Sequence, residues 1–168
     1  DSVLPHFEKG DILVIQNEIN RLEELIHKAH ERGLIIALNP SPTPADPGQL
    51  PLNEIDLLFI NEVEGAFFSG QIEPEAILDY FAKVFPHTQV ILTLGDQGSC
   101  LQEGRERIFL PCCPVEVVDT VGAGDGFAVG VISALLEGKT LLQAVNRGNK
   151  IGSLAIQVQG DSEGLPTR

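Results

Sequence analysis

The first forty residues alternate between short apolar runs and a charged segment with helical periodicity. Residues 12–15 and 34–38 are apolar throughout, which predicts two buried strands. Between these runs, apolar residues recur at the three- and four-residue spacing of an amphipathic helix, at Ile19, Leu22, Ile26 and Ala29. Gly33 is expected to end this helix. A strand, a helix and a second strand in this order predict a parallel pair of strands.

The middle of the chain repeats this pattern. Residues 57–60 and 90–94 predict two further strands, and a short helix is expected to begin near residues 61–64. Pro74 suits the first turn of another helix, because proline needs no hydrogen-bond partner there. The apolar face of that helix is predicted to contain Ala76, Ile77, Tyr80, Phe81 and Val84.

The last third of the chain begins with short alternating pieces and continues with two mainly apolar segments. The alternating pieces extend to Val118, with a turn at residues 103–104, and predict antiparallel edge strands. Helices are expected over residues 126–137 and 141–158. The whole pattern predicts one α/β domain built on a mostly parallel sheet, in which ligands bind beyond the carboxyl ends of the strands.

Charge and composition narrow the function classes. The 168 residues carry 11 Lys and Arg against 24 Asp and Glu, a net charge of −13, which argues against a nucleic-acid or anionic-membrane partner. The sequence has no apolar stretch of about 18 residues and begins without the features of a signal peptide, so a cytoplasmic protein is expected. The absence of methionine predicts that the chain is a fragment of a longer gene product.

Cysteine and histidine give little indication of a metal site. Cys100, Cys112 and Cys113 lack paired metal-ligand spacing, and we expect all three to be reduced thiols. His27 and His30 share one face of the first predicted helix, among charged residues. A solvated helix face is favoured over a metal site, because no third ligand is in view.

Residues 119–127 carry the clearest indication of chemistry. They place small residues directly before an apolar helix, where bare backbone N–H groups and the helix dipole favour an anion. Asp125 would repel that anion unless it also takes a proton, which suggests phosphoryl transfer to a hydroxyl. In this hypothesis Asp125 deprotonates the acceptor, while amides near Gly122, Ala123 and Gly124 stabilise the transferring group. From the spacing alone, an aspartate that caps a helix and is preceded by a glycine turn is an equal alternative.

Two related glycine motifs do not fit. The dinucleotide-binding fingerprint requires a following strand that ends in an acidic residue, and two helices follow instead. Residues 138–140 imitate the end of a P-loop, but Ser133 stands where that motif needs glycine. We interpret residues 138–140 as a turn between two helices.

Two further segments at strand ends are open to two interpretations each. Asn61 and Glu64 could hold a hydrated Mg²⁺ near phosphates, although a helix start with glutamate in its first turn explains the same residues and is favoured on spacing alone. Residues 93–98 could let the backbone approach a nucleotide, or could simply connect two strands tightly, which spacing favours.

Taken in order, these segments resemble the C-terminal half of the ribokinase-like (PfkB-type) carbohydrate kinases over nearly the whole chain. The resemblance implies a Rossmann-like three-layer α/β ribokinase fold with a mostly parallel sheet. It also implies that residues 1–168 are the C-terminal nucleotide-binding and catalytic part of a kinase domain whose N-terminal part and lid are missing. Residues 119–127 resemble the most specific signature of the family.

The same resemblance assigns roles to single residues. It implies that Asp125 is the catalytic base and that Gly122, Ala123 and Gly124 form the anion hole. Asn61 and Glu64 match a magnesium and phosphate motif, Asp119 is a further candidate for contact with a cation, and the nucleotide side is expected at Thr93, Gly95, Gly98 and Asn149.

Within the family, residues 126–130 and the ending 160–168 look most like 2-keto-3-deoxygluconate kinases. The implied activity is ATP- and Mg²⁺-dependent phosphorylation of a sugar or sugar-acid hydroxyl. Ribokinase and fructokinase activity remain open, as does a non-catalytic nucleotide-binding module. Ribokinases typically carry a serine near Gly164, so K⁺ activation through Asp119, Val121, Ala155 and Gly160 is in doubt. The resemblance is compatible with a homo-oligomeric parent protein, that is, the longer protein of which this chain is a part. The isolated fragment is expected to lack efficient catalysis.

Overall fold

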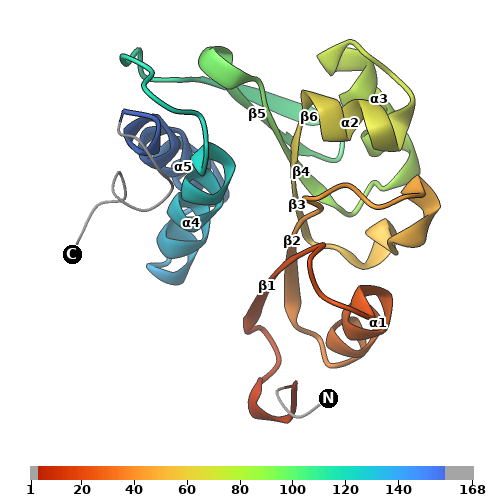
Figure 1. The fold of residues 1–168 in the computed structure, drawn as a ribbon. Coiled ribbons are helices and arrows are strands. Elements are labelled where there is room, and N and C mark those ends of the chain that lie inside the picture. The colour runs from red at the N-terminus through yellow and green to blue at the C-terminus, as the bar shows by residue number, and fades with distance from the viewer. Residues whose placement is uncertain (1–3, 158–168) are drawn as a thin grey trace. The chain divides into compact units, whose positions relative to one another are not determined.

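The computed structural model describes residues 4–157 and has the predicted α/β architecture with a mixed sheet (Figure 1). The sheet has six strands in the order of the sequence. The strands are β1 (Ile12–Gln16), β2 (Ile35–Asn39), β3 (Leu57–Asn61), β4 (Gln89–Thr93), β5 (Gly98–Glu103) and β6 (Glu106–Pro111). The first four strands are parallel, whereas the two-residue turn between β5 and β6 permits only an antiparallel pair.

The chain forms two compact units. Unit 1 contains the residues up to Thr93 together with Gln102–Arg107. Unit 2 contains Leu94–Leu101 and the residues from Ile108 onward. The hairpin of β5 and β6 therefore contributes its turn end to unit 1 and its open end to unit 2.

In unit 1, three helices cover one face of the parallel strands (Figure 1). They are α1 (Leu22–Glu31), α2 (Glu62–Ser69) and α3 (Pro74–Val84). Short 3₁₀ turns lie at η1 (Leu4–His6), η2 (Pro47–Gln49) and η3 (Leu52–Glu54). Residues 57–60 of β3 are buried throughout, as expected for a strand that lies inside the sheet rather than at its edge.

The first predicted helix begins later than its periodicity indicates. Arg21 adopts a left-handed conformation with φ of 62°, so a regular helix can start only at Leu22. Ile19 lies outside the helix and is 46% exposed, which contradicts its predicted place on the buried face. Gly33 follows the helix with φ of 72°, and the predicted stop is confirmed.

The predicted start of α3 is confirmed, but its buried face is partly wrong. Pro74 is the first helical residue, and Ile77 and Phe81 are fully buried. Val84 is 46% exposed at the end of the helix, whereas Leu78 is buried. The buried face is thus displaced toward Leu78, which packs toward the sheet.

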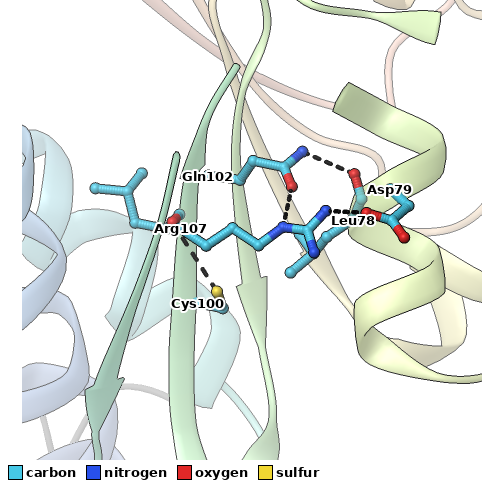
Figure 2. Close-up of polar contacts among 6 residues, drawn as sticks. Leu78, Asp79, Cys100, Gln102 and Arg107 are labelled. Atoms are coloured by element: carbon cyan, nitrogen blue, oxygen red, sulfur yellow. Dashed lines mark hydrogen bonds and ion pairs between the residues drawn. The ribbon is translucent and has the colours of Figure 1, made fainter. Parts of the chain in front are cut away.

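A buried amide connects α3 with the turn end of the β5–β6 hairpin (Figure 2). Gln102 is 1% exposed, and its Nε2 donates to the carbonyl oxygen of Leu78 at 2.9 Å. Its Oε1 accepts from Nε of Arg107 at 2.8 Å, and Nη2 of Arg107 donates to Oδ1 of Asp79 at 2.6 Å. Both ends of the Gln102 amide are therefore satisfied inside unit 1.

Unit 2 is built on two closely packed helices, α4 (Ala123–Leu136) and α5 (Leu141–Ala155). A Cβ atom on Gly130 would lie 2.9 Å from Cα of Gly148, so the two backbones meet at these glycines. Thr140 and Gln143 form a reciprocal capping box at the start of α5. The interpretation of residues 138–140 as a helix–helix turn is confirmed.

Three predicted boundaries in unit 2 are wrong. Strand β6 ends at Pro111 rather than near Val118, and in the described part of the chain the N–H groups of residues 112–117 form no backbone–backbone hydrogen bond that would continue it. Helix α4 begins three residues before the predicted Gly126. Helix α5 ends at Ala155, and the predicted end at residue 158 lies outside the described residues.

Candidate functional site

Two predicted site residues lie side by side at the carboxyl ends of β3 and β4. Asn61 is paired with Thr93 in the register of these parallel strands. The hydroxyl of Thr93 also donates to the carbonyl oxygen of Ile60 at 3.4 Å. In unit 1 the structure thus brings Asn61, Glu64 and Thr93 together at one edge of the sheet.

Asn61 and Glu64 form a capping box at the start of α2. Oδ1 of Asn61 accepts from the backbone N–H of Glu64 at 2.9 Å, and Oε2 of Glu64 accepts from the N–H of Asn61 at 3.0 Å. The interpretation of these residues as a helix start is therefore confirmed. Glu64 is only 7% exposed, and burial raises the pKa of its carboxyl, which the hydrogen bond from Asn61 partly opposes.

The same pair is a modest fit for magnesium. Among residues 4–157, no group of three or more His, Cys, Asp or Glu side chains is arranged to hold a metal ion. The capping box occupies Oδ1 of Asn61 and Oε2 of Glu64, which leaves Oε1 of Glu64 as the remaining carboxylate oxygen. Mg²⁺ is bound in proteins by one or two carboxylates together with waters and phosphates, so this donor set fits a hydrated ion.

The glycine turn of unit 2 presents unused backbone donors at the start of α4. Gly122 precedes the helix with φ of 77°, and no side chain caps the helix. In the described part of the chain, the N–H groups of Gly122 and Gly124 donate to no acceptor. A Cβ atom on Gly124 would meet nothing within 4 Å, so the turn is open to an approaching group. These features meet the requirements of an anion site.

Asp125 lies in the first turn of α4 and is exposed. Gly122 is the N-cap residue, so Asp125 does not occupy the cap position; it lies in the first turn, where a carboxylate stabilises a helix start, and this structural role stays an alternative to the catalytic one. Asp119 instead organises the turn itself, since its Oδ1 accepts from the N–H of Val121 at 3.0 Å. The turn is further attached to α5, because the N–H groups of Val118 and Asp119 both donate to the carbonyl oxygen of Ile156.

The predicted nucleotide-side glycines lie between β4 and β5: Gly95 begins a 3₁₀ turn, η4 (Gly95–Gln97), and Gly98 is the first residue of β5. Gly95 and Gly98 both have positive φ, of 57° and 110°. A Cβ atom on Gly98 would collide with the carbonyl oxygen of Leu110 and would lie 2.6 Å from the backbone nitrogen of Cys112. The backbone after β6 therefore packs directly on Gly98, which explains why only glycine fits there.

Asn149 is buried rather than displayed. The residue is only 5% exposed. Its Nδ2 donates to the carbonyl oxygen of Leu110 at 3.0 Å, and its Oδ1 accepts from the hydroxyl of Ser99 at 3.1 Å. The hydroxyl of Ser153 donates to the carbonyl oxygen of Asn149 at 2.8 Å. This arrangement places Asn149 beside the backbone that packs on Gly98. Sequence reasoning missed Ser99 and Ser153, because nothing in their spacing marks them as partners of Asn149.

The remaining expectations have mixed outcomes. His27 is exposed, and its Nδ1 lies 2.7 Å from Oε2 of Glu54, so it belongs to an ion pair. None of the helices formed by residues 4–157 has both the length and the apolar character needed to cross a bilayer. The ending at 160–168 lies outside the described residues, and so does the cation contact expected at Gly160.

Comparison with known proteins identifies the family. The sequence profile of the pfkB family of carbohydrate kinases matches residues 4–168. The chain belongs to the pfkB carbohydrate kinase family. The expected family is thus confirmed, and with it the ribokinase-like fold.

Individual pfkB relatives support the same placement. Over 114 residues, 67% of this chain, it is 48% identical to a 2-dehydro-3-deoxygluconokinase of Bacillus subtilis, of which the match covers 35%. Over 99% of its length it is 34% identical to a Bacillus subtilis ribokinase, of which it covers 56%. A structure of Arabidopsis thaliana ribokinase complexed with ribose and ATP superimposes with a TM-score of 0.81 and 30% identity, over 92% of this chain and 52% of that protein. The chain spans about half or less of the length of these relatives.

Proposed function

We propose that this chain provides the nucleotide- and anion-binding part of an ATP-dependent kinase that phosphorylates a hydroxyl of a sugar or sugar acid. The observation that carries this proposal is the start of α4, where unused backbone donors of the glycine turn lie in the same helical turn as an exposed carboxylate. A phosphate cradle alone needs no acid, whereas transfer to a hydroxyl needs a group that accepts its proton.

In this proposal the residues of the turn divide the work. Asp125 accepts the proton of the acceptor hydroxyl, while the N–H groups of Gly122, Ala123 and Gly124 stabilise negative charge on the transferring phosphoryl group. The N–H of Ala123 contacts the carbonyl oxygen of Thr120 at 3.3 Å, a long bond that an anion could replace. Asp119 holds the turn in shape through Val121.

Unit 1 contributes the carboxyl ends of β3 and β4. Glu64 would hold hydrated Mg²⁺ through its second carboxylate oxygen, and Thr93 would contact the nucleotide. When bound, Mg²⁺ would neutralise charge on the phosphates. Asn61 keeps Glu64 in position through the capping box. On the nucleotide side of unit 2, Gly95 and Gly98 would allow the nucleotide to approach the backbone closely. The buried Asn149 holds the neighbouring backbone through its hydrogen bond to the carbonyl oxygen of Leu110.

The preferred acceptor in this proposal is 2-keto-3-deoxygluconate. The support is the 48% identity with the Bacillus subtilis 2-dehydro-3-deoxygluconokinase, which exceeds the 34% identity with the ribokinase of the same organism. Ribose is the second candidate, because the likeness to ribokinase extends over 99% of the chain. Whether K⁺ assists through Asp119, Val121 and Ala155 stays a prediction.

The first experiment measures ADP release by the protein as it occurs naturally, with ATP and Mg²⁺. The acceptors are 2-keto-3-deoxygluconate, ribose, fructose and adenosine, each tested with and without K⁺. We expect the highest kcat/KM with 2-keto-3-deoxygluconate. A higher kcat/KM with ribose or fructose would change the proposed acceptor but support the proposed kinase activity. No turnover with any of the four acceptors would count against the kinase activity.

The second experiment tests the proton acceptor. Asp125→Asn is expected to reduce kcat by several orders of magnitude and to leave ADP binding nearly unchanged. Glu116→Gln, which alters an exposed carboxylate shortly before the turn, is the matched control and should keep full activity. Tight ADP binding without turnover in the unaltered protein would instead indicate a non-catalytic nucleotide-binding module.

A further inference from the structure

Two adjacent thiols lie at the point where the chain leaves β6 and packs on Gly98. Cys112 is half-buried and Cys113 is exposed, and neither takes part in a disulfide. In the described part of the chain, residues 112–117 form no backbone–backbone hydrogen bond through their N–H groups. Cys113 is therefore on a segment whose backbone can adjust without breaking secondary structure, whereas the backbone at Cys112 is packed on Gly98.

The spacing of adjacent cysteines disfavours a disulfide but not a bridged site. Neighbouring Cα atoms are about 3.8 Å apart, below the roughly 4.4–6.8 Å that disulfides span. Two sulfurs bound to one soft centre at about 2.3 Å each can lie roughly 3.5 Å apart, far more than the about 2.05 Å of a disulfide. A thiophilic centre that takes two thiolates suits this pair, since thiolates are soft ligands.

The thiol of Cys112 is also part of the hydrogen-bond chain behind Gly98. Its Sγ lies 3.0 Å from Oγ of Ser153, whose hydroxyl donates to the carbonyl oxygen of Asn149 at 2.8 Å. Because the single hydroxyl proton of Ser153 is directed to the carbonyl oxygen of Asn149, the Cys112 thiol is the donor available to Ser153, and its Sγ also lies 3.6 Å from the carbonyl oxygen of Cys113 as a second acceptor. A ligated Cys112 has no proton to donate.

We propose that Cys112 and Cys113 form a two-thiol site for a soft thiophilic species, and that occupation of this site weakens nucleotide binding at Gly98. When Cys112 loses its proton, its sulfur and the hydroxyl oxygen of Ser153 face each other as two acceptors with no proton between them. Ser153 then either loses a partner or turns its proton away from Asn149. The second part of the proposal rests on the proposed function, whereas the site itself does not.

The test uses phenylarsine oxide as the probe. Its As=O bond and two S–H bonds are replaced by two As–S bonds, with release of one water and no change in oxidation state. Intact-mass measurement should find one phenylarsenic adduct that resists excess monothiol but is removed by a dithiol such as 2,3-dimercaptopropanol. Cys113→Ser should lose this resistance, and Cys100→Ser, which alters the buried third thiol, should retain it.

ADP binding to the isolated adduct tests the coupling. We expect the Kd for ADP to rise at least tenfold in the adduct. In Ser153→Ala, which removes the shared oxygen, the adduct should form with a clearly smaller rise. A wild-type adduct that monothiol removes would overturn the site, and a resistant adduct with unchanged Kd would overturn the coupling. Absence of ADP binding before modification would count against the proposed function, while the mass measurement still decides the site.

Discussion

The hydroxyl of Ser99 donates to Oδ1 of Asn149 at 3.1 Å, across fifty residues of sequence. Ser99 is fully buried in β5 and Asn149 is 5% exposed in α5. With Nδ2 of Asn149 bonded to Leu110, one carboxamide connects both strands of the hairpin to the helix. Direct contact of this carboxamide with a nucleotide would require it to give up these partners, so we assign Asn149 a supporting role.

Asn149→Ala is expected to lower the free energy of unfolding by about 2 kcal/mol, because it leaves the Ser99 hydroxyl and the Leu110 carbonyl buried without partners. Urea denaturation measures the change. Asn146→Ala, at an exposed position of the same helix, is the matched control and should stay within about 0.5 kcal/mol of the unaltered protein. Equal effects of the two substitutions would show that the buried carboxamide contributes nothing specific.

Gly98→Ala is expected to destabilise the protein by about 3 kcal/mol, because it combines an unfavourable positive φ with a collision against the backbone at residues 110–112. Gly95→Ala separates these causes. Gly95 also has positive φ but open space around its Cα, so only about 1 kcal/mol is expected. Thermal unfolding of both variants measures the two losses of stability. If Gly98→Ala is destabilised no more than Gly95→Ala, the close approach of the backbone to Gly98 is contradicted.

Glu64→Gln is expected to change how stability depends on pH. Burial raises the pKa of Glu64 in the folded protein, so the folded state holds the proton more tightly than the unfolded state. The contribution of Glu64 is therefore greatest below its unfolded pKa of about 4.5 and is lost as pH rises through the raised folded value. Compared with wild type, Glu64→Gln should gain relative stability as pH rises through this interval.

Urea denaturation from pH 4 to pH 8 measures this difference. Glu62→Gln, at an exposed position of the same helical turn, is the control and should follow wild type. If the stability difference between wild type and Glu64→Gln is the same at every pH, burial does not raise the pKa of the Glu64 carboxyl.

His27 is expected to titrate above its ordinary pKa of 6.5, mainly because it is hydrogen-bonded to Glu54. The stabilisation from this pair is fully present below the unfolded pKa and is lost as pH rises through the folded one. Glu54→Gln should lower the pKa of His27, as measured by NMR titration of its ring. An unchanged His27 titration in Glu54→Gln would contradict this pairing.

The sequence was a good guide wherever one local pattern determined the structure. The four parallel strands agree with the predicted apolar runs to within about one residue, because each contains an uninterrupted apolar run, although only β2, β3 and β4 are buried along their centres and the edge strand β1 is partly exposed. The turn at residues 138–140 and the helix that begins at residue 141 were likewise predicted, whereas the capping partner Gln143 was not. The predicted boundaries were wrong where a single residue departed from its usual conformation, as at Arg21, or where a strand ended earlier than its alternating pattern, as β6 does at Pro111.

The site could be predicted only in part. The glycine turn and Asp125 are contiguous in sequence, so a candidate site could be proposed from the sequence alone, and its chemistry stays a prediction. The supporting contacts could not be read in this way, since Ser99, Leu110, Asn149 and Ser153 meet only through tertiary packing. Asn61 and Glu64 show the opposite limit, because the same two residues form a capping box and are also the ones expected to hold a metal ion, so the pattern does not separate the two roles.

The division of the β5–β6 hairpin has a consequence for dissecting this protein. The chain passes between the two compact units three times, after Thr93, after Leu101 and after Arg107. No single proteolytic nick can therefore release either unit intact. A piece ending at Thr93 would keep α3 but lose Gln102 and Arg107, so the carbonyl of Leu78 and the carboxylate of Asp79 would lose the partners that fasten this helix to the hairpin.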